Sequence, residues 1–163
     1  NTDYFTLPEP LYTEVPKVLS LADPNKKMSK SLGEKHVINI FGDLERVKKQ
    51  VRSAVTDTGE SSEMSPGILN LFTLLKASGK HEAHASLMKD YEAQTLKYSE
   101  LKEAVSDGLI ELITPIQERY NEIVKDKKEV KNQIKYSSAR IRERAQSTLR
   151  EVKEIAGLLN PKG

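Results

Sequence analysis

Beyond residue 42, hydrophobic residues recur at three- and four-residue spacing along most of the chain. That spacing places them on one face of a helix, so it predicts a series of amphipathic helices packed as a bundle. Capping residues and prolines set the expected boundaries. The predicted helices cover 43–55, 66–79, 81–94, 99–124, a fifth that starts at Asp126, and a sixth that restarts at Ser137 or Ser138 and ends near Gly157 and Pro161.

The apolar stripes indicate which side of each helix faces the core. The helix over 66–79 is apolar almost all round, so we expect it to be the buried central rod of the bundle. In the helix over 99–124, Pro115 predicts a kink because it removes one intrahelical hydrogen bond. The expected inward residues are Leu87, Met88 and Tyr91, then Leu101, Val105, Leu109, Leu112, Ile116, Tyr120 and Ile123, and finally Ile141, Ala145, Thr148, Leu149, Val152 and Ile155.

Residues 1–41 have a different pattern. Their four prolines exclude a long helix, and two runs of strand length, 15–21 and 36–41, flank a polar loop rich in Lys and Ser. The sequence therefore predicts a mainly α protein, a helical bundle over 42–163 preceded by a short α/β remnant over 1–41. Because the chain opens on Asn1 and runs at once into Tyr4-Phe5-Thr6, we expect it to be a fragment of a longer protein.

Composition narrows the function classes. With 37% hydrophobic residues, 6% aromatic residues and no Trp among 163 residues, the core must consist mainly of Leu, Ile, Val and Ala, which is typical of a helical bundle. The absence of Cys excludes disulfides, Cys-ligated metals and thiol catalysis, and it fits a reducing compartment such as the cytoplasm. No apolar run approaches the roughly 18 residues of a membrane span. His81 and His84 lack a third ligand by spacing, so no metal site is expected.

Charge is strongly segregated although the formal net charge is only +2. Residues 57–122 hold twelve acidic against six basic residues, whereas residues 125–153 hold ten basic against four acidic. The basic segment has the composition of a surface that meets an anion such as nucleic acid, and an ordinary solvated helix face is the alternative. Its candidate contacts are a ridge of Lys127, Lys131 and Lys135 and the flanking Arg140, Arg142 and Arg144, each of which could instead pair with Glu143 or Glu151.

One short motif carries specific chemistry. Lys27-Met28-Ser29-Lys30-Ser31 resembles the mobile ATP-binding signature loop of class I aminoacyl-tRNA synthetases, and the preceding residues 18–24 look like the tryptophanyl members of that family. Three further segments are similar to the same members in the same order, so the resemblance spans about residues 8–158. They are Ala54-Val55-Thr56-Asp57, Met64-Ser65-Pro66-Gly67 and Pro115-Ile116-Gln117-Glu118-Arg119-Tyr120.

The resemblance implies a role for each residue of the loop. Activation of an amino acid expels pyrophosphate from ATP, so negative charge grows on the leaving phosphates and cations must neutralise it. By carry-over from the family, Lys30 stabilises the transition state, Lys27 assists it, and Met28 and the backbone of Val18 lie at the adenine. Ser29, Ser31 and the loop amides can donate further hydrogen bonds. Leu32 departs from the family, many members of which carry an acidic residue there.

The resemblance also implies partners and limits. The parent would join tryptophan to tRNA(Trp) with ATP and Mg²⁺, residues 1–41 would end its Rossmann-type catalytic domain, and residues 42–163 would bind the tRNA anticodon. The tryptophan pocket, a His-containing nucleotide motif and most of a homodimer interface would lie outside the chain, so we expect the fragment to be catalytically incomplete and leave its oligomeric state open. The alternatives are a non-catalytic helical RNA-binding module and a structural adaptor.

Overall fold

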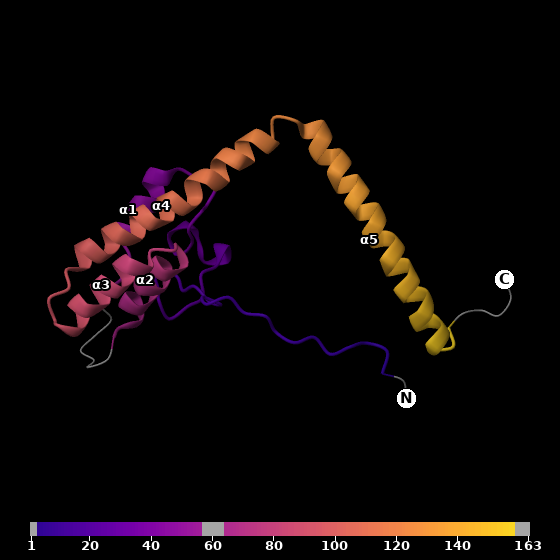
Figure 1. Ribbon diagram of the computed structural model, residues 1–163, viewed down its shortest axis with the longest axis horizontal. Coiled ribbons are helices and arrows are strands. Elements are labelled where there is room, and N and C mark those ends of the chain that lie inside the picture. The colour runs from indigo at the N-terminus through magenta and orange to yellow at the C-terminus, as the bar shows by residue number, and fades with distance from the viewer. Residues whose placement is uncertain (1–2, 57–63, 159–163) are drawn as a thin grey trace. The chain divides into compact units, whose positions relative to one another are not determined.

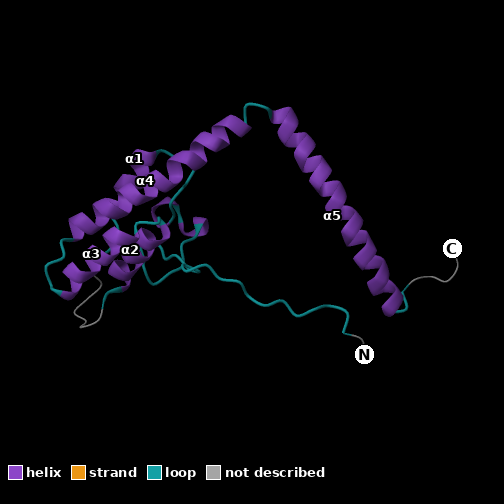
Figure 2. Ribbon diagram, in the orientation of Figure 1, coloured by secondary structure: helices purple, strands orange, loops and turns teal. Residues whose placement is uncertain are grey.

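The computed structural model describes residues 3–56 and 64–158. Their regular structure is helical throughout (Figures 1 and 2). By packing, residues 12–119 form one compact unit, and the described residues of 1–11 and 120–163 form another. The elements are η1 (Lys30–Leu32) and η2 (Glu34–His36), which are short 3-10 turns, and the helices α1 (Leu44–Arg52), α2 (Pro66–Ala77), α3 (His81–Glu92), α4 (Tyr98–Ile123) and α5 (Lys127–Ile155).

Three helix starts follow the capping residues in the sequence. The Asp43 carboxylate accepts the Glu45 N–H, which caps α1 at 3.0 Å. Ser65 precedes Pro66 at the first helical position of α2 and accepts from Ile68 N. The Asp126 carboxylate accepts the Glu129 N–H at 2.9 Å and so begins α5. The structure confirms these predicted boundaries. A capping residue sets a helix start because it satisfies backbone N–H groups that the helix itself leaves unpaired.

The core of the unit formed by 12–119 lies around α2, as predicted. Leu71, Phe72 and Leu75 of this helix are at most 1% exposed. They join one apolar cluster with residues of α1 and α4, among them Val51 and Leu101. On α3, Leu87 is buried, and Met88 and Tyr91 are half-buried against the same cluster.

The expected stripe of α4 is correct only in its first half. Leu101, Val105 and Leu109 are buried, but the next buried residue is Ile113 rather than Leu112, which is 43% exposed. The buried row continues at four-residue intervals, which moves it off the face that carries Leu112. The later members Ile116, Tyr120 and Ile123 are exposed as well.

Helix α4 also runs through Pro115 as one continuous element. The proline lacks the N–H that would bond the Glu111 carbonyl, which is why the sequence favours a bend there. The kink itself stays a prediction.

Helix α5 corrects two further expectations. It is one helix of 29 residues, without the restart expected at Ser137 or Ser138. It contains no Gly or Pro. A serine in a helix costs less than about 1 kcal/mol of free energy relative to alanine, so the surrounding Lys, Arg, Glu and Gln residues, which favour helix, keep it continuous. Its end is confirmed at Gly157, whose φ of 66° stops the helix, while Pro161 lies outside the described residues.

The apolar stripe of α5 is not buried. Ile141 is 69% exposed and Leu149 53%, and no described residue of this helix is fully buried. Only Thr148 and Val152 are half-buried within the stripe. Val152 lines a shallow hollow with Tyr4 and Phe5, and the Tyr4 hydroxyl donates to the Glu151 carboxylate at 2.7 Å. That bond lowers the pKa of Glu151 and raises the pKa of Tyr4.

The two runs of strand length are not strands in the described chain. The 15–21 run contributes a single bridge, between Leu19 and Lys27, and the 36–41 run starts in η2 and continues without regular structure. A strand forms when a neighbouring backbone takes its N–H and C=O groups. Here part of that pairing comes from side chains of the helices.

Candidate functional site

The signature loop begins at a tight hairpin. Ser20 N–H donates to the Lys26 carbonyl at 2.9 Å, and Met28 N–H donates to the Val18 carbonyl at 3.0 Å. These two bonds flank the Leu19–Lys27 bridge, which fixes Lys27 opposite Leu19. The backbone of the first signature lysine therefore has a defined position.

The turn of this hairpin is held by Asp23. Its carboxylate accepts the Asn25 N–H at 3.2 Å and forms an ion pair with Lys26 at 2.9 Å. The bond to Lys26, together with the backbone N–H of Asn25, holds the pKa of Asp23 below its ordinary value. Lys26 is thus paired with a carboxylate, whereas its neighbour Lys27 forms no ion pair with any carboxylate that the structure describes.

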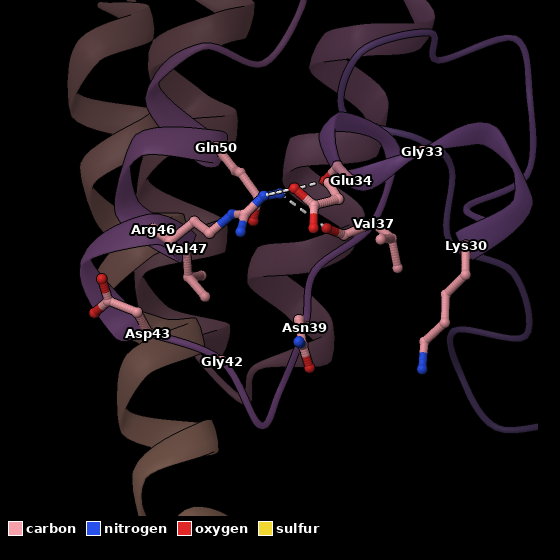
Figure 3. Close-up of a pocket in the computed structure, with 10 residues that line it drawn as sticks. All are labelled: Lys30, Gly33, Glu34, Val37, Asn39, Gly42, Asp43, Arg46, Val47 and Gln50. Carbon is pink, nitrogen blue, oxygen red and sulfur yellow. Dashed lines mark hydrogen bonds and ion pairs between the residues drawn. The ribbon is translucent and has the colours of Figure 1, made fainter.

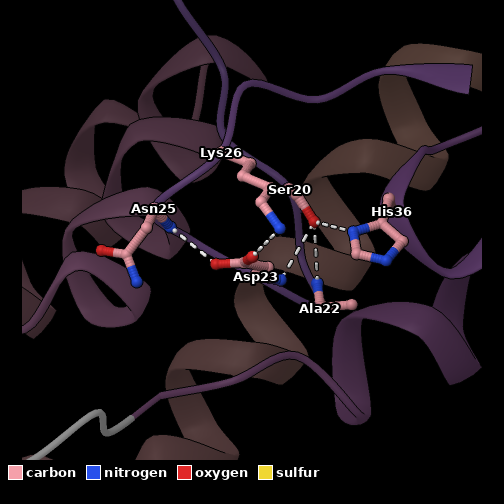
Figure 4. A network of polar contacts seen from close by, with 6 residues as sticks. All are labelled: Ser20, Ala22, Asp23, Asn25, Lys26 and His36. Atoms are coloured by element: carbon pink, nitrogen blue, oxygen red, sulfur yellow. Dashed lines mark hydrogen bonds and ion pairs between the residues drawn. The ribbon is translucent and has the colours of Figure 1, made fainter. Parts of the chain in front are cut away.

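Behind the turn lies a buried hydroxyl, Ser20, that is 0% exposed (Figure 4). Its oxygen accepts the N–H groups of Ala22 at 3.1 Å and Asp23 at 3.0 Å, and it lies 2.8 Å from Nδ1 of His36. A hydroxyl has two acceptor sites and one hydrogen, so these three contacts use its full hydrogen-bonding capacity. The network thereby connects the turn at residues 20–23 to His36.

Side-chain amides from three helices hold the rest of segment 18–42. We call them the amide clamps: Asn70 of α2, Gln50 of α1 and Gln117 of α4. Each one pairs with backbone groups that a β-sheet would otherwise satisfy. Asn70 pairs with both the N–H and the carbonyl of Leu19 at 3.0 Å, Gln50 donates to the carbonyls of Glu34 at 2.6 Å and Val37 at 3.0 Å, and Gln117 donates to those of Ile40 at 2.9 Å and Gly42 at 2.8 Å.

Both signature lysines are exposed, and no carboxylate of the described residues forms an ion pair with either of them. Lys30 opens η1, for which Ser29 is the N-cap. The Ser29 hydroxyl accepts from Ser31 N and lies 2.8 Å from the Ser31 hydroxyl. Two cations three residues apart on a short, exposed loop can meet a polyanion without first breaking an ion pair.

The residues at the adenine end, as the resemblance assigns them, are placed differently from the lysines. Val18 and Met28 are half-buried against the hydrophobic core, and the Val18 carbonyl accepts the Met28 N–H. Their proposed contact with a nucleotide stays a prediction. The structure brings Val18 and residues 27–31 together in one hairpin and its continuation.

A groove of about 370 Å³ lies beside the loop, between η1, η2 and α1 (Figure 3). Lys30 and Arg46 line it from opposite sides, and Val37 and Val47 contribute apolar surface. Arg46 forms an ion pair with Glu34, so Lys30 is the basic residue of this groove whose charge no described carboxylate neutralises.

The six basic residues predicted to contact nucleic acid are all exposed on α5, but they divide between two faces. At about 100° per residue, Lys127, Lys131, Lys135 and Arg142 fall within about a quarter of the helix circumference. Every acidic residue of α5 lies on the opposite half, together with Arg140 and Arg144. The first group is thus a basic face free of carboxylates.

The predicted alternative for the arginines was pairing with acids of the same helix. Within the part of the chain that the structure describes, none of Arg140, Arg142 and Arg144 forms an ion pair. Glu151 instead accepts from Tyr4 and Ser147, and the Arg140 guanidinium lies 6.0 Å from the centre of the Tyr136 ring.

Sequence reasoning missed the amide clamps. Asn70 gave a usable signal, because it is a polar amide in the middle of a helix that is otherwise apolar all round, and a buried amide needs partners. Gln50 and Gln117 gave none, since glutamine is common on helix surfaces. The histidines of α3 have a different use: His84 packs edge-on against Phe72, with ring centres 5.4 Å apart. The described residues contain no group of three or more potential metal ligands.

Comparison with known proteins identifies the class to which this loop and these helices belong. Residues 1–114 match the sequence model of the family described as tRNA synthetases class I (W and Y). The chain belongs to that family.

Its relatives include tryptophan–tRNA ligases of several bacteria. The chain is 31% identical to tryptophan–tRNA ligase of Wolinella succinogenes over 98% of its own length and 50% of the relative. It is 33% identical to tryptophan–tRNA ligase of Buchnera aphidicola over 95% of its length and 48% of the relative. A crystal structure of tryptophanyl-tRNA synthetase from Mycoplasma pneumoniae matches with a TM-score of 0.73 and 30% identity, over 90% of this chain and 45% of that one.

These matches confirm the resemblance to tryptophanyl-tRNA synthetases that the sequence motifs indicated. The chain spans about half the length of the curated relatives it matches. In the described ranges, no helix combines the length and the apolar character that a membrane crossing requires.

Proposed function

We propose that this chain is part of a tryptophan–tRNA ligase, an enzyme that activates tryptophan with ATP and Mg²⁺ and transfers it to tRNA(Trp) in the cytoplasm. Residues 1–41 would complete the α/β catalytic domain, and residues 42–163 would form the helical domain that binds the anticodon. The observation that carries the proposal is the pair Lys27 and Lys30, exposed and without an ion pair to any described carboxylate, on a loop fixed by the helical core.

In this function, the loop neutralises the phosphates of ATP. Lys30 would stabilise the charge that grows on the leaving pyrophosphate, Lys27 would assist, and Ser29 and Ser31 would add hydrogen bonds. Mg²⁺ would arrive bound to the phosphates of the nucleotide. The chain alone, without a tryptophan pocket, would make no adenylate, and the parent would act as a homodimer.

The test is the exchange of labelled pyrophosphate into ATP by the whole synthetase that contains this chain. Lys30→Ala should slow adenylate formation by roughly 100- to 1,000-fold, the loss typical of one group that stabilises transition-state charge. Lys35→Ala is the matched control, since Lys35 is also exposed in the same segment and has no assigned contact. Equal rates in wild type and Lys30→Ala would contradict the proposal.

The proposed role of α5 is to bind the tRNA. Its carboxylate-free face is suited to the phosphate backbone, which would relieve the repulsion within the lysine ridge. Arg140 and Arg144 would contact bases, because a guanidinium can pair bidentately with a base edge or stack on it.

Salt dependence tests this role. With three or four phosphates neutralised, log affinity of the chain for tRNA(Trp) should fall against log salt with a slope of about −2 to −3. Changing Lys127, Lys131 and Lys135 together to Gln should flatten the slope by about one to two units. Replacing Arg140 and Arg144 should instead reduce discrimination against a mutated anticodon. If the lysine variant binds like wild type, this face is an ordinary solvated helix surface and not a tRNA contact.

The runner-up function, a non-catalytic RNA-binding module, shares the α5 face and differs at the loop. It leaves the two unpaired signature lysines without a ligand. The pyrophosphate exchange assay separates the two functions, because only the synthetase makes an adenylate.

A further inference from the structure

Asn70 occupies the place that a neighbouring β-strand would fill. In an antiparallel pair, successive residues direct their backbone polar groups to opposite edges. Val18 and Ser20 bond to Met28 and Lys26, so the N–H and carbonyl of Leu19 face the other edge. Asn70 takes both of them, accepting the N–H at its Oδ1 and donating its Nδ2 to the carbonyl, each at 3.0 Å.

The support for this contact comes from the core. Asn70 is 3% exposed and lies on α2 next to Leu71 and Phe72, each 1% exposed. A helix that is buried on most of its sides cannot shift without disrupting the packing of the core, so the Asn70 amide has a fixed position. Leu19 is hydrogen-bonded to this amide, and the two hairpin bonds hold Lys27 opposite Leu19.

We propose that Asn70 is a positioning residue for the signature lysines, which rests on the proposed function of the loop. Its amide sets the register of residues 18–20, and the hairpin transmits that register to Lys27 and, through Met28 and Ser29, to Lys30. The central helix of the core thereby determines where the two cations meet the phosphates of ATP. Asn70 itself touches no reacting atom.

Asn70→Asp in the whole synthetase tests this role. The aspartate keeps the shape and the acceptor for the Leu19 N–H, but as a carboxylate it cannot donate, and its second oxygen faces the Leu19 carbonyl. We expect kcat/KM for ATP in pyrophosphate exchange to fall about 10- to 100-fold, the range that a displacement of about 1 Å produces. The KM for tryptophan should change less than about twofold. A mere loss of folded enzyme would lower kcat and leave both KM values unchanged, so the two explanations can be distinguished.

Ser106→Ala is the matched control. Ser106 is 4% exposed, and its hydroxyl donates to the Lys102 carbonyl within its own helix, α4. This variant should lose stability without a selective change in the KM for ATP. Both variants are assayed at temperatures equally far below their own melting temperatures. If Asn70→Asp and Ser106→Ala then change the KM for ATP and the KM for tryptophan to the same extent, the positioning role is overturned.

A combined variant shows whether Asn70 acts through the two lysines. If it does, adding Asn70→Asp to an enzyme that already carries Lys27→Gln and Lys30→Gln should slow it no further, whereas independent effects multiply and would contradict the proposal. Failure of the proposed function gives a different result, namely no exchange by the wild-type enzyme. Amide hydrogen exchange then tests the role of Asn70 in the hairpin. That role requires the Ser20 and Met28 N–H groups, which form the two hairpin bonds, to lose protection in Asn70→Asp and to keep it in Ser106→Ala.

Discussion

Segment 18–42 and helix α5 carry the two halves of the proposed chemistry, and they are ordered by different means. The segment has one β-bridge and two short 3-10 turns, and side chains of α1, α2 and α4 pair with its backbone. Helix α5 satisfies its own backbone over 29 residues and buries no residue completely. Long-range contacts specify the first region, and local sequence specifies the second.

The difference matches what each region is asked to do. A loop that neutralises a transition state needs its cations at defined positions, so it gains from attachment to a rigid core. A basic face that meets a phosphate backbone works through net charge and spacing, which a single exposed helix already provides. Changes in the core should therefore reach the loop and leave α5 untouched.

The largest contrast is expected for leucines truncated in each region. Leu75 of α2 is 0% exposed, so Leu75→Ala should lower the free energy of unfolding by about 2–5 kcal/mol through lost burial and a cavity. Leu149→Ala is the matched change on α5, where the side chain is 53% exposed, and should stay within about 0.5 kcal/mol. Urea unfolding followed by circular dichroism measures both. Equal losses would mean that the α5 stripe is buried after all.

The next effect concerns the junction between the loop region and α2. A Cβ at Gly67 would stand 2.1 Å from the Val55 carbonyl oxygen, and Val55 N–H donates to the Leu21 carbonyl. Gly67→Ala should thus cost about 1–3 kcal/mol although alanine normally favours a helix.

Gly108→Ala is the control for the same substitution within a helix. Its closest contact is the Ser78 hydroxyl, a side-chain atom that can move if it gives up its hydrogen bond to the Leu75 carbonyl, so the loss should be smaller. A larger loss at Gly108 than at Gly67 in thermal unfolding would contradict this explanation of the Gly67 position.

The same contrast explains what the sequence could predict. Helix starts at Asp43, Ser65 and Asp126 were predictable because a cap acts within three residues of itself. The strand-like runs misled, because their β-branched residues favour extended backbone and say nothing about which groups will pair with it. Asn70 and Gln117 lie 51 and 77 residues from their partners, so no local pattern could connect them.

At the candidate site, a loop with two exposed signature lysines was predictable, and the arrangement around it was not. The spacing of Lys27 and Lys30 indicated paired cations on one loop, and both are exposed on it. The division of the α5 residues into a carboxylate-free face and a mixed face follows from an uninterrupted helix. The expected restart at Ser137 or Ser138 concealed that division.

An intermediate effect should follow from removal of one amide clamp. Gln117→Glu replaces a donor to the carbonyls of Ile40 and Gly42 by a carboxylate that faces both, and should cost about 1–2 kcal/mol. Gln133→Glu makes the same change on α5 beside Glu129 and should cost only a few tenths of a kcal/mol. Equal midpoints for the two variants in urea would show that the clamp contributes nothing beyond a surface glutamine.

The smallest effect concerns pH and involves the core region alone. Burial, with the positive charges of Lys76 and His81, lowers the pKa of His84 below its ordinary value of 6.5. As pH falls below about 6.5, the unfolded chain takes up a proton at this position while the folded chain does not, so stability decreases until folded His84 is protonated as well. His84→Gln removes this contribution.

The quantity to measure is the difference in unfolding free energy between wild type and His84→Gln at several pH values between 7.5 and 5.5. The wild type should lose stability relative to His84→Gln as pH falls, because only the wild type gives up a proton at position 84 when it folds. His81→Gln is a second variant on the same helix: it takes away one of the positive charges near His84, so it should weaken the pH dependence without abolishing it. A difference for His84→Gln that stays constant with pH would show that His84 titrates alike in the folded and unfolded chain, and that its packing against Phe72 does not exclude the proton.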